Sequence, residues 1–266
     1  MKKYTKLLKY ELKTILKDRL NLFILVYPVL MLFIMGFILP QILNKMGSLH
    51  TEGASLGLLI GYTVTLSIGG YVAGGLLGFL ILEHKDESTL LSIAVTPMSL
   101  SGYLTFKMIY TTIISILGNF VLLGGLKLIA SDAYEIHYGG VVIGLLDSLD
   151  FWKILSFSIV SSFVVPLVAS VIGGIAKNKI EGFAYMKFGG FFVMIPSLVL
   201  LPFFFDWKQY LLGIFPNFWS IKAVLVASLG SQQAADLSFY GYLAIGCLIQ
   251  AVITILSIRI LSKKII

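Results

Sequence analysis

The residue types that most often carry acid–base or metal chemistry are few and scattered in this 266-residue chain. The three histidines, His50, His84 and His137, and the single Cys247 lie far apart and show no metal-ligand spacing. No Ser-His-Asp or Cys-His set is placed to converge, and no stretch matches the G-x-x-x-x-G-K-[ST] loop that holds nucleotide phosphates. The sequence therefore predicts a chain that binds no metal or cofactor, is not an enzyme and has no ATPase site of its own.

Charged and hydroxyl side chains concentrate in one stretch, residues 83–97. It begins with Glu-His-Lys-Asp-Glu, continues as an amphipathic run and stops at Thr96-Pro97, where the proline disfavours helical geometry at the residue before it. We expect a short charged helix at the membrane surface, joined to a span on either side. A protein that docks on this helix could move both spans; an ordinary polar connection is the alternative interpretation.

Long apolar runs must hold this stretch in place. The chain is 58% hydrophobic and 12% charged, which is about half the charged fraction of a soluble domain. A membrane-spanning helix takes about 20 mostly apolar residues, and these runs lack the alternation of barrel strands. We expect an all-α integral membrane protein with one transmembrane domain, residues 1–266. Its six spans are expected near residues 20–40, 55–82, 104–129, 154–175, 183–205 and 237–261.

Two segments beside the spans are apolar in a different way. Residues 1–19 place leucine and isoleucine at helical spacing with lysines opposite, which predicts an amphipathic interfacial helix on the inner leaflet, with a plain tail as the alternative. Residues 206–236, before the last span, hold two short apolar halves around Pro216, and we expect re-entrant or interfacial helices there. The acidic loop 130–153 is interpreted as solvated.

Basic residues set the expected orientation. With both termini in the cytoplasm, most of the 20 Lys and Arg residues fall on the inner side, as the positive-inside rule requires. The net charge of +7 is explained in the same way, so we expect membrane lipid and no nucleic acid as its partner. The predicted location is a bacterial plasma membrane, with a multi-pass topology.

Glycines recur in the second predicted span. Their four-residue spacing is expected to place them on one helix face, where helix backbones can approach closely. We interpret them as packing positions, and a substrate path is the alternative. The residues are Gly57, Gly61, Gly70, Gly74 and Gly78.

Ionisable residues fall in loops or near span ends under this assignment. Ion-coupled transporters usually place one at membrane depth, so the energy for transport is expected to enter from outside the membrane. A secondary (ion-coupled) transporter of hydrophobic compounds remains an alternative. A membrane enzyme that acts on lipid is a third interpretation.

The stretch 83–97 resembles the motif E-x-x-x-x-G-T-L-E-x-L-L-x-T-P, which ABC-2 type exporter permeases carry after the second of six spans. The chain departs from it at Ser88, Leu91 and the pair 93–94. The matching positions are Glu83, Thr89, Leu90, Thr96 and Pro97.

The resemblance covers essentially the whole chain and implies a permease subunit of an ABC exporter. It implies a separate nucleotide-binding ATPase subunit that binds ATP and Mg, and a second permease chain, identical or related, that completes a dimer. The expected cargo is an amphipathic or hydrophobic compound: a peptide, an antibiotic or a lipid-like molecule. The implied coupling residues are Glu83, Glu87, Thr89, Leu90, Thr96 and Pro97, with Asn178 and Glu181 in a second cytoplasmic loop.

Overall fold

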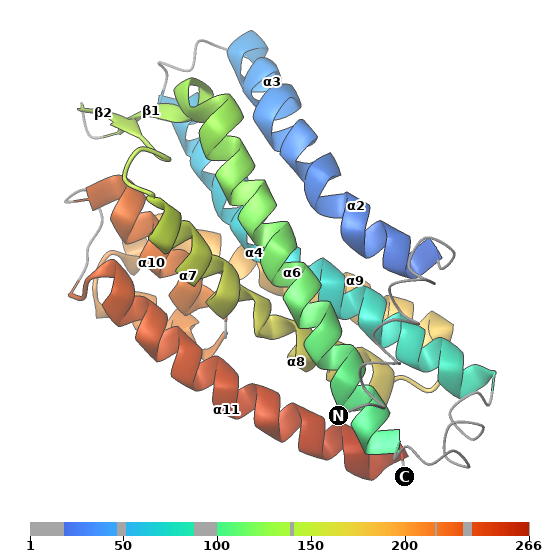
Figure 1. The fold of residues 1–266 in the computed structure, drawn as a ribbon. Coiled ribbons are helices and arrows are strands. Elements are labelled where there is room, and N and C mark those ends of the chain that lie inside the picture. Colours follow the sequence, from blue (N-terminus) through green and yellow to red (C-terminus); the bar gives the residue numbers. More distant parts are fainter. Residues whose placement is uncertain are drawn as a thin grey trace.

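Six long apolar helical segments dominate the computed structural model (Figure 1). The structure describes residues 19–46, 52–87, 100–138, 141–215, 217–230 and 236–265. The predicted all-α integral membrane fold with six spans is confirmed. The segments long and apolar enough to cross a membrane are Asn21–Leu43, Gly53–Asp86, Leu100–Tyr134, Phe151–Ile175, Lys179–Leu200 and Phe239–Arg259.

The first span has a wide turn in its middle. It joins α2 (Arg19–Phe33), the π-helix η1 (Ile34–Ile38) and α3 (Leu39–Met46), whereas the sequence predicted one span over residues 20–40. The helix continues through Pro40 as far as Met46, beyond the predicted end of the span. The predicted interfacial helix, residues 1–19, lies outside the described residues except for Arg19.

The second and third spans are single long helices, α4 (Glu52–Asp86) and α6 (Leu100–Ala130). The fourth is divided into α7 (Phe151–Ser162) and α8 (Val164–Ile175) at Phe163. A proline within a helix removes a backbone hydrogen bond, and Pro166 does so in the first turn of α8. The Thr254 hydroxyl, from the last span, donates to the Phe163 carbonyl at 3.0 Å, where the two helices meet.

The fifth span begins and ends earlier than the predicted range, 183–205. It comprises α9 (Lys179–Met194) and the 3₁₀ helix η3 (Ile195–Leu200). Leu201 is extended (φ −81°, ψ 139°) because Pro202 follows it, and a residue before proline is driven out of helical geometry. A separate short 3₁₀ turn, η4 (Pro202–Phe204), comes next.

The segment before the last span forms two short helices, η5 (Trp207–Ile214) and α10 (Phe218–Leu229). They flank residue 216, which lies outside the described residues. Helix α10 is mostly buried against the rest of the bundle, so this segment is an integral part of the core. The last span is α11 (Phe239–Ile265).

The acidic loop after the third span is more ordered than the solvated loop that the sequence predicted. The 3₁₀ turn η2 (Ser131–Tyr134) leads into an antiparallel hairpin of β1 (Glu135–Tyr138) and β2 (Val141–Gly144), with Glu135 opposite Gly144. Tyr134 is fully buried and donates to the Met35 carbonyl at 2.9 Å. Each strand has only four residues, which is too short for an alternation of polar and apolar side chains to predict it from the sequence.

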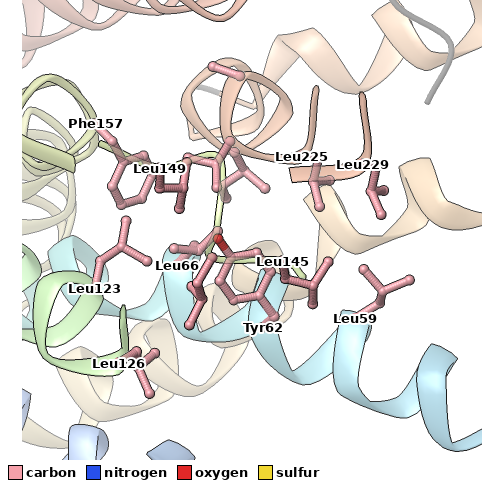
Figure 2. Packing of buried hydrophobic residues seen from close by; sticks show 14 of the residues in the cluster. Leu59, Tyr62, Leu66, Leu123, Leu126, Leu145, Leu149, Phe157, Leu225 and Leu229 are labelled. Carbon is pink, nitrogen blue, oxygen red and sulfur yellow. The ribbon is translucent and has the colours of Figure 1, made fainter. Parts of the chain in front are cut away.

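The main core lies between α4, α6, α7 and α10 (Figure 2). Tyr62 is fully buried at its centre, and its ring meets that of Tyr134 edge-on, with centroids 5.9 Å apart. Leucines from four separate segments surround these rings. Those labelled in the figure are Leu59, Leu66, Leu123, Leu126, Leu145, Leu149, Leu225 and Leu229.

The two ends of the bundle differ. The β hairpin lies at one end, which we call the hairpin end (Figure 1). The last turn of α4, the start of α6 and the end of α11 lie at the opposite end, which we call the Glu83 end.

Candidate coupling site

At the Glu83 end, an ion pair joins two spans that are distant in the sequence. Glu83 lies in the last turn of α4, and Lys179 is the first residue of α9. The Lys179 ammonium lies 3.0 Å from a Glu83 carboxylate oxygen. Both side chains are partly exposed, so the pair contributes little to stability. Its importance is positional, because it connects the two loops that the sequence proposed as separate contacts.

The second of these loops is fixed by helix capping. Asn178 caps α9 by accepting a hydrogen bond from the Glu181 backbone N–H at 2.9 Å, and the Glu181 carboxylate accepts from the Lys177 N–H at 2.7 Å. Such caps satisfy backbone groups that an isolated helix end leaves unpaired. Asn178 and Glu181 therefore hold the turn between α8 and α9 in one shape, and a role in contacting an ATPase remains a prediction.

A further contact joins α4 to the third span. The His84 Nδ1 lies 3.3 Å from the Tyr103 hydroxyl, near the start of α6. The helices on both sides of the 83–97 stretch are thus connected to each other. Glu87 is exposed and continues α4 through a backbone bond to Glu83. Of the predicted coupling residues, Thr89, Leu90, Thr96 and Pro97 lie outside the described residues.

Close packing at glycines links these helices along their length. A Cβ at Gly74 would come within 2.8 Å of the Val165 carbonyl, and one at Gly78 within 2.6 Å of Ile172. On the α9 side, a Cβ at Gly182 would lie 2.5 Å from Leu82. Helices α4, α8 and α9 therefore fit together at short range near the Glu83 end, as small residues permit in membrane helices.

The sequence predicted that the five glycines of the second span lie on one helix face. The structure shows that they do not. Gly70, Gly74 and Gly78 approach α8, whereas Gly57 and Gly61 approach Leu43 and Leu39 of α3. Gly61 and Gly70 are nine residues apart, which is about two and a half turns at 3.6 residues per turn. The two groups of glycines therefore point in opposite directions.

Lys222 lies in the segment 206–236, where the sequence predicted re-entrant or interfacial helices, and the structure buries it completely in α10. Its ammonium lies 5.8 Å from the centre of the Tyr242 ring. Burial lowers the pKa of Lys222 to about 8, while the nearby Asp236 acts in the opposite direction. Its position as a single lysine within an apolar stretch was the signal that could have identified it.

The neighbours of Lys222 form a polar network between η5 and α11. Tyr210 donates to the Asp236 carboxylate, and its hydroxyl lies 3.1 Å from that of Tyr242. Burial, followed by these hydrogen bonds, raises the pKa of Tyr210. No group of three or more His, Cys, Asp or Glu that could hold a metal ion occurs among the described residues.

The fold and this site define a multi-pass helical membrane protein with an ion pair between two spans at one end of the bundle. A family model described as "Fluoroquinolones export permease protein Rv2686c-like" matches residues 11–258. The chain belongs to this family of export permeases.

Two relatives come from Mycobacterium tuberculosis. They are the fluoroquinolones export permease proteins MT2760 (strain CDC 1551 / Oshkosh) and Rv2686c (strain ATCC 25618 / H37Rv). Each is 29% identical over 162 residues, which is 59% of this chain and 55% of the relative. The chain thus spans about half the length of the curated relatives it matches. No solved structure matches the chain.

Proposed function

We propose that this chain is the membrane-spanning subunit of an ATP-driven exporter, in which a separate subunit binds ATP and Mg and hydrolyses the nucleotide. The observation that carries the proposal is the Glu83–Lys179 ion pair, 3.0 Å long, which joins both predicted docking loops at one end of the bundle. Membership of an export permease family supports the transport role.

The mechanism follows from how the helices are joined. An ATPase docks on the stretch 83–97 and on the turn at 177–182. When ATP binding draws two ATPase subunits together, the displacement enters α4 and α9 at the Glu83–Lys179 pair. Since α4 also packs on α8 at Gly74 and Gly78 with little free space, three helices shift together and change access to the substrate.

The proposal includes an orientation and a partner. The proposed orientation has the Glu83 end and both termini in the cytoplasm of a bacterial cell. In the part of the chain that the structure describes, the basic residues at this end include Lys85, Lys177 and Lys179. A second permease chain, identical or related, pairs with this one in the membrane. The exposed apolar side chains of α2, α6 and α9 supply surface for such a contact and for lipid.

The proposed cargo is an amphipathic or hydrophobic compound. The relatives are named as exporters of fluoroquinolones, so a fluoroquinolone is the first compound to test. A peptide or a lipid-like molecule is the wider alternative.

The test is uptake into inside-out membrane vesicles that contain the complex purified with its native ATPase. We expect norfloxacin to accumulate with ATP, not with a non-hydrolysable analogue, and to do so in the presence of a protonophore. Replacement of Thr96-Pro97 by Ala-Ala should abolish uptake while assembly is retained. Uptake that persists without ATP and collapses with the proton gradient would instead identify an ion-coupled transporter.

A further inference from the structure

A half-open cavity of about 280 Å³ lies between α4, α8 and α9, beside the start of α10. It is separate from the charged contacts at the Glu83 end. Its lining includes Ser67 and Tyr71 of α4, Phe188 and Phe192 of α9, and Phe215 and Asn217 in the segment before α10.

Aromatic rings form one wall of this cavity. The Phe192 ring lies 5.4 Å from that of Phe215, centre to centre, with 30° between their planes, and 5.8 Å from Phe188, nearly perpendicular to it. Phe188 is 66% exposed and Phe192 is 42% exposed. Part of their surface is therefore not used within the chain and can stack against a flat ring from outside.

Three polar residues, Ser67, Tyr71 and Asn217, also line the cavity. The Tyr71 hydroxyl donates to the Met186 carbonyl, and the Ser67 hydroxyl donates to the Thr63 carbonyl at 3.1 Å, so each oxygen can still accept a hydrogen bond. Asn217 does not use its side chain to cap α10. No charged side chain is among the lining residues that the structure describes. The occupant must therefore be uncharged where it enters the cavity.

We infer that this cavity binds the planar aromatic part of the exported compound, a small aromatic amphiphile; this rests on the proposed function. The volume is near the lower end of the range of ligand pockets, about 300–1,000 Å³. That size accepts a fused ring system and excludes a folded peptide. A lipid acyl chain would use neither the ring faces nor the Asn217 amide.

The helices that line the cavity are also the helices that the proposed motor would move. Its walls are α4, α8 and α9, the helices joined at the Glu83 end. A Cβ at Gly189 would strike the Tyr71 hydroxyl, so α4 and α9 approach closely beside the cavity. A displacement of α9 relative to α4 changes the distance between Tyr71 and the phenylalanine wall, and thereby the affinity for the ring.

Binding tests the inference without the ATPase. The full chain is placed in phosphatidylethanolamine–phosphatidylglycerol nanodiscs, and the Kd of radiolabelled norfloxacin is measured. Val171 lines the cavity at its exposed edge, so Val171→Trp should weaken binding at least tenfold. Ile175 lies one turn further along α8, is also exposed and does not line the cavity, so Ile175→Trp is the matched control and should change the Kd less than twofold.

A second test removes aromatic rings from the cavity wall, whereas Val171→Trp adds a ring that occupies the cavity. The double variant Phe188→Ala/Phe192→Ala should weaken binding about tenfold, because it removes two stacking faces. Phe191→Ala is the control, since Phe191 is 69% exposed on the same helix and does not line the cavity. Equal thermal unfolding of all variants shows that they fold.

Three results overturn the inference. These are a wild-type chain that does not bind norfloxacin, a folded Val171→Trp chain with unchanged Kd, and a Val171→Trp chain that loses labelling by a photoreactive phospholipid but keeps norfloxacin binding.

Failure of the proposed function looks different. Binding that depends on the cavity, without ATP-driven uptake, rejects the motor and keeps the site, whereas ATP-driven uptake that is unchanged in Val171→Trp rejects the site and keeps the motor.

Discussion

At the scale of single residues, charge at the Glu83 end and charge within α10 have different consequences. Glu83 and Lys179 are half-exposed and pair across two helices, so removing either should leave the fold intact. Lys222 has no exposed surface, and burial lowers its pKa to about 8 although Asp236 acts in the opposite direction, so its protonation in the fold differs from that in the unfolded chain. Residue-scale predictions therefore separate into one about transport and one about stability.

Replacing Glu83 by Gln removes its charge and keeps its shape. If Glu83 transmits motion between the ATPase and the spans, substrate-stimulated ATPase activity of the assembled complex should fall by up to about fivefold, the effect of losing an exposed ion pair worth up to about 1 kcal/mol. Asp86→Asn, an exposed carboxylate on the same turn, is the control and should have little effect. Wild-type stimulation in Glu83→Gln would contradict the coupling role.

Replacing Lys222 by Met should remove a pH dependence of stability. Because the pKa of Lys222 is about 8 in the fold against 10.5 in the unfolded chain, the unfolded chain binds more protons between these values, and stability rises with pH across that window. In thermal unfolding of the detergent-solubilised chain, Lys222→Met should remove the rise in Tm between pH 8 and 10.5. Lys177→Met, a change at an exposed lysine, should keep it.

At the scale of elements, the sequence predicted helices well and their interruptions poorly. Six apolar runs were found because hydropathy depends only on the local sequence. The π-helix at Ile34–Ile38 and the break at Phe163 have partners elsewhere in the chain, such as the Thr254 hydroxyl that donates to the Phe163 carbonyl. The short strands of the hairpin are held by burial of Tyr134 against Met35, a contact across 99 residues that no local pattern contains.

The α4–α8 interface gives an element-scale prediction. A Cβ at Gly74 would meet the Val165 backbone carbonyl at 2.8 Å, and backbone cannot move aside as a flexible side chain can. Gly74→Ala should therefore lower the free energy of unfolding by about 1–3 kcal/mol, as overpacking does. Gly124 of α6 has nothing within 4 Å of its Cβ position, so Gly124→Ala should be neutral or stabilising by up to about 1 kcal/mol. Equal unfolding midpoints for the two variants would disprove the close packing.

At the scale of the whole molecule, the sequence predicted the two loops of the candidate site but not the contact that joins them. The motif beginning at Glu83 and the turn at 177–182 were each visible as charged loops. Their connection through Lys179 was not, because it depends on α4 and α9 lying side by side, and nothing in either loop specifies its neighbour. The same reason explains why the aromatic cavity was not expected, although Phe188 and Phe192 belong to a run of phenylalanines in the sequence.

The orientation of the molecule can be checked by cysteine labelling. In a Cys247→Ser background, Val142→Cys in the hairpin should react with a membrane-impermeant maleimide in intact cells, because Val142 is 56% exposed at the end assigned to the outside. Lys177→Cys at the Glu83 end should react only after permeabilisation. The reverse pattern would place the Glu83 end outside the cell and exclude docking of a cytoplasmic ATPase there.

The bond between Tyr134 and Met35 has a consequence for biogenesis. The first span presents much of its surface outward, and the Met35 carbonyl in its π-helix accepts a hydrogen bond from Tyr134 at the end of the third span. A membrane protein is made from its N-terminus, so this span enters the bilayer before its anchor has been synthesised. The first span must therefore wait beside the insertion machinery or in lipid until two more spans have emerged. Truncated chains that end before Tyr134 should leave it accessible to proteases and quality control, whereas chains that extend through the hairpin should protect it.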